Sequence, residues 1–400
     1  MRPKILFLCT ACPFGTSGSG VRTMHVAKLL EKVGPVTMVV ATERPWTDEQ
    51  LAKTRATFNL GAYILYRPAP IRTLADRWRQ VFDPKFMNSN GVAVPPEAAR
   101  QVQDLVDSHD LVWIHTFKLA NAFRRFQWPH SVLDVDDYPS RFHASAAPHT
   151  PWVIPKFRRW RNAFAWRRRE SVWAERFSVV SVCKESDRAH FGGGPRVQVV
   201  PNGFEAPVTA PVRTLNATAP CLGMIGDFTY LPNSNGLNWF LQNCWPAVRR
   251  EIPGARLRLI GKSSDTIARS QPSEGVIGLG YVPDTGAEIA TWSAMIVPTR
   301  LGGGTHLKVA EGLARRVPII TTQHGARGYT VEHGRHLLIA DAADDFTRAC
   351  CRLLTDPAAG ARLSDAGWEL FNQRYSWDSI APAVAATVEA GLAQDRGGLR

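Results

Sequence analysis

Residues 293–322 read SAMIVPTRLGGGTHLKVAEGLARRVPIITT. The apolar run at 293–297 has the composition of a buried strand, three glycines follow it, and apolar residues then recur at helical spacing from Thr305. A second apolar run, VPIITT, closes the stretch. This order of strand, loop, helix and strand is typical of a parallel sheet covered by helices, in which ligands bind beyond the carboxyl ends of the strands.

The same order recurs along both halves of the 400-residue chain. Apolar runs without polar alternation suit strands that are buried on both faces of a sheet. The runs are KILFLCT, VTMVVAT, DLVWIHT, SVLDVDD and FSVVSVC in the first half, and CLGMIG, ARLRLIG, GVIGLGY and SAMIVPT in the second. A chain of this length can hold two buried cores. We therefore expect an α/β fold of two Rossmann-like, doubly wound parallel-sheet domains that face a cleft.

The segment between the two sets of strands, PNGFEAPVTAPVRTLNATAP, has the composition of an interdomain linker. It is rich in Pro, Thr and Ala and holds few bulky residues. We place the boundary near residue 210, which predicts an N-terminal domain at 1–210 and a C-terminal domain at 211–374. The segment 375–400 begins with a helical pattern, and we expect it to pack back on the N-terminal domain.

The composition, 44% hydrophobic and 21% charged, is that of an ordinary globular protein and argues against disorder. No apolar run reaches the roughly 18 residues that a membrane-spanning helix needs, and the apolar part of MRPKILFLCTACPFG is too short for a signal peptide. Seven cysteines, an odd number, argue against a disulfide framework. We expect a cytoplasmic protein in which Cys9 and Cys12 are buried thiols or, as the alternative, a redox or metal pair.

The net charge of +13 belongs mostly to the first half of the chain. Residues 1–200 hold 29 Lys and Arg against 17 Asp and Glu, whereas residues 201–400 are nearly balanced. Residues 141–176 hold nine of these basic residues, with tryptophans between them. Basic residues and indole rings together are typical of helices that lie on anionic lipid. A membrane surface or anionic acceptor is the interpretation we favour, and a merely solvated helix and nucleic-acid binding are the alternatives.

Two polar clusters follow expected strands of the first domain. Gly15, Gly18 and Gly20 lie between the first strand and a helix, so that the backbone can approach an anion closely. His115 ends the run DLVWIH. The glycine loop does not complete the G-x-G-x-x-G pattern, which argues against a nicotinamide cofactor.

The third cluster lies in the quoted stretch itself. If its helix begins at Thr305, the first N–H groups and the positive end of the helix dipole favour a phosphate. Lys308 and Glu311 are three residues apart and share a face. A cation and a carboxylate there suit a nucleotide, whose diphosphate is negative and whose ribose offers two hydroxyls. The alternative is a plain turn with a Lys308–Glu311 ion pair. A Walker loop is excluded, because the G-x4-G-K-[ST] spacing is absent.

Several segments follow one another in a specific order: GTSGSGVRTMHVAKLL, SVVSVCKESD, VVPNGFE, GMIGDFTYLPNSNGLNWFL, RLIGK, GYVPD and PTRLGGGTHLKVAEGLARRVPIITT. In order and spacing they resemble retaining glycosyltransferases with the GT-B fold, family 4 (glycosyl transferases group 1), over nearly the whole chain. The resemblance implies two Rossmann-like domains, an acceptor site mainly on the first and a nucleotide-sugar site mainly on the second, with no metal.

Around the three glycines the resemblance is to a subgroup that reads GxGxRLKxxEA. It implies that Glu311 accepts hydrogen bonds from the ribose hydroxyls and that Gly303 stands where other relatives keep a glutamate. Many relatives also hold an Arg and a Lys after the first strand of the second domain, where this chain has FTYLPNSNG. Lys308 is then the main cation for the diphosphate, assisted by Arg22 or His306.

Other positions follow from the same resemblance. His115 matches a histidine that contacts the donor sugar in relatives, and Tyr281 and Val282 match the loop whose backbone meets the nucleobase. Asp136 and Asp137 lie on the acceptor side, where one orients a hydroxyl or, as the alternative, serves a helix cap or loop. The remaining residues expected on the donor side are Gly18, Gly20, Gly226, Gly304 and Thr305.

The implied reaction is transfer of a hexose from a UDP- or GDP-sugar to a hydroxyl with retention of configuration. The leaving diphosphate deprotonates the incoming hydroxyl, so the protein has to stabilise charge on that diphosphate. We expect a lipid-linked or other anionic glycan acceptor, as in polysaccharide or glycolipid assembly, with peripheral contact at the inner face of the plasma membrane. No cofactor, metal or nucleic acid is expected. A nucleotide-sugar epimerase of GT-B fold and a basic nucleic-acid-binding protein are the alternative functions.

Overall fold

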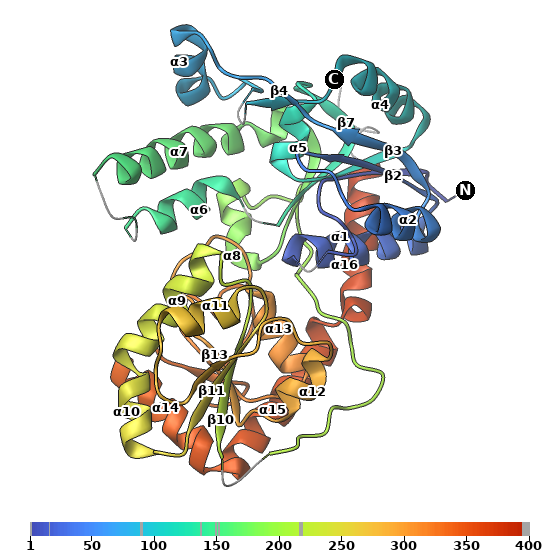
Figure 1. The fold of residues 1–400 in the computed structure, drawn as a ribbon. Helices are drawn as coiled ribbons and strands as arrows, with labels where there is room; N and C mark the ends of the chain where they lie inside the picture. Colours follow the sequence, from blue (N-terminus) through green and yellow to red (C-terminus); the bar gives the residue numbers. More distant parts are fainter. Residues whose placement is uncertain are drawn as a thin grey trace. The chain divides into compact units, whose positions relative to one another are not determined.

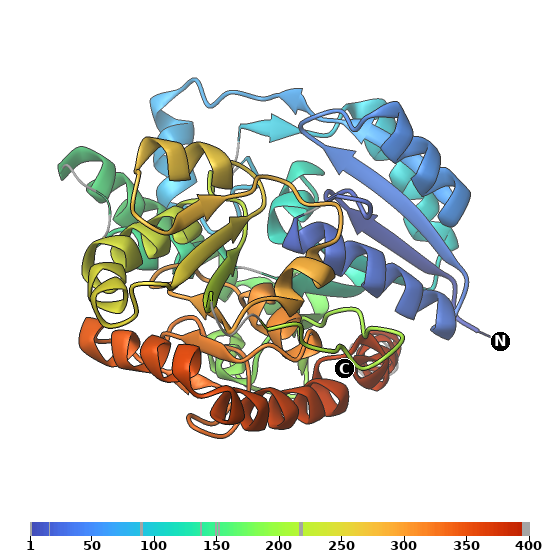
Figure 2. The ribbon, with the colours of Figure 1, turned by 60° about the horizontal axis from the view of Figure 1, so that its bottom comes forward.

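The computed structural model describes residues 2–15, 17–88, 91–136, 138–148, 150, 153–215 and 219–393. Contacts divide the chain into two units (Figure 1). Unit 1 consists of Met1–Asn202 with Ile380–Arg400, and unit 2 of Gly203–Ser379. Figures 1 and 2 show a parallel sheet with helices on both faces in each unit. The predicted α/β fold with two Rossmann-like domains is thereby confirmed, and the division into acceptor and donor domains stays a prediction.

Unit 1 is built on seven parallel strands in the order β3-β2-β1-β6-β7-β8-β9. Every residue of β1 and β6 is buried, as the unbroken apolar runs predict for strands covered on both faces. The strands are β1 (Ile5–Cys9), β2 (Val36–Thr42), β3 (Leu60–Leu65), β6 (Leu111–His115), β7 (Trp128–Val135), β8 (Phe177–Val182) and β9 (Val197–Val199).

The helices of unit 1 alternate with these strands, and a short antiparallel pair, β4 (Arg67–Pro68) with β5 (Val92–Ala93), lies outside the main sheet. The last helix, α16 (Trp377–Ala393), belongs to unit 1 from Ile380 onward. Near its end, a Cβ placed on Gly391 would lie 2.6 Å from Leu111 Cδ1, so this helix packs directly on β6. The other helices are α1 (Gly18–Val33), α2 (Asp48–Thr57), α3 (Leu74–Phe82), α4 (Pro96–Ser108), α5 (Phe117–Ala122), α6 (Pro139–Ala146), α7 (Val153–Ser171) and α8 (Glu185–Arg188).

Unit 2 repeats the scheme with six parallel strands in the order β12-β11-β10-β13-β14-β15. Its strands are β10 (Cys221–Ile225), β11 (Arg256–Ile260), β12 (Val276–Gly278), β13 (Ala294–Val297), β14 (Ile319–Thr321) and β15 (Leu338–Ile339). Its helices are α9 (Leu231–Asn243), α10 (Trp245–Glu251), α11 (Ser264–Ser270), α12 (Thr285–Ala290), α13 (Leu307–Ala314), α14 (Ala343–Thr355) and α15 (Pro357–Arg374).

The stretch at 293–322 therefore forms β13, a loop, α13 and β14, in the predicted order. The helix begins at Leu307, with His306 as the N-cap residue, and not at Thr305. The two residues before it stay in the loop because the three glycines continue an irregular backbone, in which Gly302 has a φ of 127°. Lys308 is consequently in the first turn of α13, next to the orphan N–H groups of the helix end.

Candidate functional site

The carboxyl ends of the unit 2 strands bring Lys308 to a residue that the sequence analysis did not single out. Lys308 Nζ donates a hydrogen bond of 2.6 Å to Asn233 Oδ1. Asn233 lies in the first turn of α9, and its Nδ2 donates to the carbonyl oxygen of Asp227 at 2.8 Å. The ammonium of Lys308 is thus held by an amide of α9, which in turn donates to the loop after β10. The charge of Glu311 still attracts Lys308, but the ammonium bonds to Asn233, and among the described residues no ion pair joins Lys308 to Glu311, so the alternative of a self-contained pair is wrong.

Gly226, the residue after β10, leaves the space in which this bond forms. A Cβ built on Gly226 would lie 2.8 Å from Asn233 Nδ2 and 3.5 Å from Lys308 Nζ. The next loop crosses close by, because a Cβ on Gly261, whose φ is 109°, would lie 2.3 Å from the carbonyl oxygen of Gly226. Two glycines therefore allow the loops after β10 and β11 to meet beside Lys308.

Burial shifts both ionisable groups of α13 toward neutrality. Burial lowers the pKa of Lys308 to about 8, while the charge of Glu311 acts in the opposite direction. Burial raises the pKa of Glu311 to about 7, against the charges of Arg315 and Lys308. A desolvated cation and a desolvated carboxylate without a bond to each other form an arrangement typical of binding and catalytic sites.

The glycine loop leads into the N-terminus of α13. The side chain of His306 makes no capping hydrogen bond to the first turn of the helix. Gly303, Gly304 and Thr305 precede His306 in the loop, where the sequence analysis placed them on the donor side. The first-turn N–H groups and the helix dipole give this end a partial positive charge, which adds to that of Lys308.

Tyr281 and Val282 lie in the loop between β12 and α12. The Tyr281 side chain is 76% exposed, whereas Val282 packs against the core cluster that includes Val309 of α13. The preceding residue, Gly280, accepts a hydrogen bond of 2.7 Å from Gly261 N through its carbonyl oxygen. This loop is therefore joined to the loop after β11, within the same edge of the sheet that holds Gly226.

In unit 1, Arg22 is a buried structural residue. Its side chain is 1% exposed, and it donates to both carboxylate oxygens of Asp134, at 2.6 Å from Nη2 and 3.0 Å from Nε. Nη1 donates to the Asn202 side chain at 2.8 Å and to the carbonyl oxygens of Val200 and Pro201 at 3.2 Å. The expectation that Arg22 assists the diphosphate is therefore corrected, because its donors are directed to these internal acceptors.

His115 reaches the same carboxylate from the neighbouring strand. His115 and Asp134 lie opposite each other in the β6–β7 register, and His115 Nδ1 is 3.1 Å from Asp134 Oδ2. Ser181, opposite Asp134 on β8, donates to Oδ1 at 3.2 Å. Nε2 of His115 is buried and has no hydrogen-bond partner among the described residues. The ring is thus oriented by a fixed partner on one side, and its other nitrogen is available to a ligand.

Asp134 is the residue that sequence reasoning missed. Burial favours its protonated form, but the charge of Arg22 and the hydrogen bonds from His115 and Arg22 hold the pKa of Asp134 far below its usual range. The signal was present, because a carboxylate between Leu133 and Val135 in an otherwise apolar buried strand requires a partner.

Asp136 is the residue that follows β7, and it contacts the segment at the start of α1. Asp136 accepts hydrogen bonds from Ser19 Oγ at 3.1 Å and from Asn202 Nδ2 at 2.7 Å. Gly18 is the first residue of α1, and a Cβ on Gly20 would lie 2.5 Å from the carbonyl oxygen of Cys12, so Gly20 permits the loop to pack on the helix. Asp137 lies outside the described residues.

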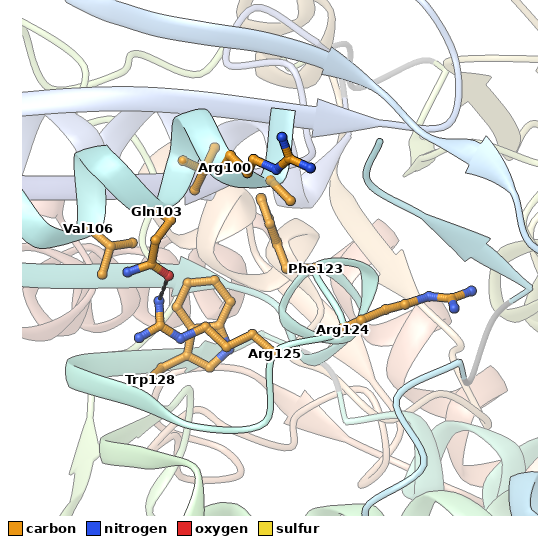
Figure 3. A pocket seen from close by; sticks show the side chains of 9 residues that line it. Arg100, Gln103, Val106, Phe123, Arg124, Arg125 and Trp128 are labelled. Carbon is orange, nitrogen blue, oxygen red and sulfur yellow. Dashed lines mark hydrogen bonds between the residues drawn. The ribbon is translucent and has the colours of Figure 1, made fainter. Parts of the chain in front are cut away.

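A pocket of about 450 Å³ lies elsewhere in unit 1, between α4 and the segment that precedes β7 (Figure 3). Arg125 Nη1 donates to Gln103 Oε1 at 2.6 Å across it, and Trp128 forms part of its wall. None of the residues predicted from the sequence lines this pocket. In the described parts of the chain, no group of three or more His, Cys, Asp or Glu side chains could hold a metal ion.

Part of unit 2 is similar to a known protein family. Residues 219–356 match the family model of the glycosyl transferases group 1. The match includes Gly226, Asn233, Lys308 and Glu311. No curated protein sequence matches the chain.

The fold is found in solved glycosyltransferase structures. HepE of Anabaena, in complex with UDP and glucose, is 16% identical with a TM-score of 0.64 over 97% of this chain and 99% of that one. Sucrose-phosphate synthase of Thermosynechococcus elongatus is 14% identical with a TM-score of 0.66, over 95% and 97% of the two chains. TarM of S. aureus, as a mutant in complex with Fondaparinux, alpha-GlcNAc-glycerol and UDP, is 9% identical with a TM-score of 0.66, over 96% and 99%. These likenesses show the GT-B fold.

Proposed function

We propose that the chain is a retaining glycosyltransferase that moves a sugar from a nucleoside diphosphate sugar to a hydroxyl. The observation that carries the proposal is the pair on α13: a half-buried ammonium and a half-buried carboxylate that do not bond to each other, inside the segment that matches the family model. A ligand that offers both an anion and hydroxyl donors can interact with both groups. A nucleotide offers both, in its diphosphate and its ribose.

In this proposal the residues of unit 2 bind the donor. Lys308 and the N-terminus of α13 stabilise the negative charge that develops on the leaving diphosphate, and Glu311 accepts from the ribose hydroxyls. Asn233 holds the ammonium in place before the donor arrives. Gly303, Gly304, Thr305 and His306 supply the loop around the phosphates, and Tyr281 with Val282 meets the base.

His115 of unit 1 is the proposed contact to the donor sugar. Asp134 fixes its ring through Nδ1, which leaves Nε2 as the group for a sugar hydroxyl. Gly18 and Gly20 belong to the same side, and Asp136 is the candidate for orienting the acceptor hydroxyl. We propose that the deprotonation of that hydroxyl is carried out by the departing diphosphate, without a metal or cofactor. The donor is a UDP- or GDP-sugar.

The basic excess of unit 1 supports an anionic acceptor, lipid-linked or part of another glycan, in cell-surface polysaccharide or glycolipid assembly. It also supports peripheral contact with a membrane at the inner face of the plasma membrane, since cations near an anionic surface contribute about 1 kcal/mol each. No helix among the described residues is both long and apolar enough to cross a bilayer.

The test is incubation of the purified protein with UDP-, GDP- and ADP-sugars, with thermal stabilisation and slow donor hydrolysis as readouts. One class of nucleotide sugar should stabilise the protein, and Lys308→Ala and Glu311→Ala should each strongly reduce that stabilisation without lowering the melting temperature of the ligand-free protein. Glu332→Ala and Arg335→Ala are matched controls, because this exposed pair in unit 2 has the same spacing of three residues. If no nucleotide sugar stabilises the protein, the proposal is refuted.

The products of the reaction distinguish an epimerase from a transferase. An epimerase converts one nucleotide sugar into another without an acceptor, whereas a transferase releases the nucleoside diphosphate. Chromatography of the donor after long incubation distinguishes the two outcomes.

A further inference from the structure

Half of the large apolar side chains that are exposed on the described residues belong to only two helices of unit 1. We name these residues the α3–α7 face. On α3 they are Leu74, Trp78 and Phe82, which are 81%, 65% and 41% exposed. On α7 they are Val153, Ile154, Phe157, Trp160 and Phe164, which are 84%, 74%, 67%, 49% and 47% exposed. Such a concentration of exposed apolar surface marks an interaction site.

The two sets meet where α3 and α7 pack against each other (Figure 1). The ring of Phe82 meets the ring of Phe164 edge-on, with 6.0 Å between the centroids, and Trp78 lies 4.6 Å from Phe82. The spacing on α3 is four residues, and on α7 the positions 153, 157, 160 and 164 are three or four apart. Each set therefore lies along one side of its helix.

Two arginines of α7 fix the position of α3. Arg168 Nε donates to the carbonyl oxygen of Phe82 at 3.0 Å, and Nη2 of Arg169 donates to the carbonyl oxygen of Gln80. Arg169 is 2% exposed, and burial lowers its pKa to about 10. Both arginines therefore bind carbonyl groups in the last turn of α3, where cations are favourable. The apolar face is consequently held in shape without a partner.

The charged side chains that α7 contributes beside the α3–α7 face are all positive. Between Val153 and Arg169 the helix α7 carries seven basic residues and no acidic one: Lys156, Arg158, Arg159, Arg161, Arg167, Arg168 and Arg169. Its single acid, Glu170, is buried and accepts from Ser140 and His190. The acids beside α3, Asp76 and Asp83, are both paired with Arg79. An occupant of this face therefore meets an apolar strip flanked by cations.

We propose that the α3–α7 face inserts into the interfacial layer of an anionic bilayer, with its aromatic and aliphatic side chains at the level of the headgroups. This inference deepens the peripheral membrane contact of the proposed function, which it assumes. It adds that apolar insertion through two helices holds the protein on the membrane, and that attraction of the basic residues alone does not. Helices with an apolar side and flanking Lys and Arg bind membranes in this way.

The test is flotation with vesicles of phosphatidylglycerol and phosphatidylcholine, compared with phosphatidylcholine alone. One variant, Leu74→Ser with Trp78→Ser, changes α3, and a second, Ile154→Ser with Phe157→Ser, changes α7. We expect each to bind the anionic vesicles about tenfold more weakly than the unmodified protein. Val208→Ser with Val212→Ser is the matched control, because both valines are exposed apolar residues of unit 2, at 104% and 79%. It should bind as the unmodified protein does.

Each other outcome overturns the proposal. Equal binding of all variants places the membrane contact elsewhere, and loss confined to the α7 variant removes α3 from the contact. Failure of the unmodified protein to float shows that the face does not bind membranes. If the unmodified protein is a dimer and the α3 variant is a monomer, the face is a dimer interface. If the protein binds RNA and both variants lose that binding equally, the face binds RNA. Flotation is measured without nucleotide sugar and donor stabilisation without vesicles, so failure of this inference and failure of the proposed transferase activity are seen separately.

Discussion

The ionisation of Lys308 and Glu311 predicts how the affinity for a nucleotide sugar depends on pH. The proposed donor site needs Lys308 protonated and Glu311 ionised. Because the pKa of Glu311 is raised to about 7 and that of Lys308 is lowered to about 8, both conditions hold together only in a narrow window. The affinity should therefore rise as pH increases through 7 and fall as pH increases through 8.

The size of the effect follows from the two titrations. At pH 7.5 about 60% of the molecules carry both charges, and at pH 6 or pH 9 about 10% do. The association constant should thus be about sixfold higher at pH 7.5 than at either limit. Titration calorimetry with the best-binding nucleotide sugar measures it. A nucleotide sugar is preferred over a free nucleoside diphosphate because its phosphates have no terminal ionisation in this range.

Variants separate the two limbs of the pH profile of affinity: the acidic limb, where affinity rises through pH 7, and the alkaline limb, where it falls through pH 8. Lys308→Met should lose the alkaline limb and Glu311→Gln the acidic limb. Asn233→Asp places a carboxylate beside the ammonium, which raises the pKa of Lys308 and moves the alkaline limb to higher pH. A flat profile between pH 6 and pH 9 in the unmodified protein, or an alkaline limb that persists in Lys308→Met, would refute the reasoning.

Two further predictions concern residues whose surroundings the structure defines. Asp134→Ala leaves Arg22 buried without its partner and should lower the unfolding free energy of unit 1, measured by urea unfolding, by about 3–5 kcal/mol. The double change Arg22→Met with Asp134→Leu should lower it by less. Equal losses of unfolding free energy would contradict the ion-pair assignment. Gly226→Ala forces a methyl group to within 2.8 Å of Asn233 Nδ2 and should displace the side chain that holds Lys308. The affinity for the nucleotide sugar, measured by calorimetry, should fall about tenfold. An unchanged affinity would show that the Asn233 contact is dispensable.

The layered fold could be predicted because it depends on local patterns. Unbroken apolar runs are sufficient to indicate strands covered on both faces, and the runs quoted from both halves correspond to β1, β6, β10 and β13, among others. The start of α13 was predicted two residues early because glycines and a threonine are compatible with both a loop and a helix end.

The contacts of the site were harder to predict from the sequence, because they join residues that are far apart in the chain. Asn233 and Lys308 are separated by 75 residues, and nothing in FTYLPNSNG indicates that an amide holds the lysine. Arg22 was expected to assist the diphosphate, whereas Asp134, 112 residues away, allows it to be buried. The contribution of α3 to the apolar face was missed because LADRWRQVF, with two Arg and one Asp, carries little net charge.

The surroundings of Arg22 have a consequence for the order in which unit 1 is completed during synthesis. Arg22 lies near the start of the chain, but its acceptors Val200, Pro201 and Asn202 are made about 180 residues later. Asp134 can pair with the guanidinium earlier, but until residues 200–202 emerge Nη1 of Arg22 lacks all three of its acceptors. We therefore expect the first glycine loop and α1 to reach their final positions only after β9 has been added. The N-terminal end of the chain is then among the last parts of its own sheet to become fixed.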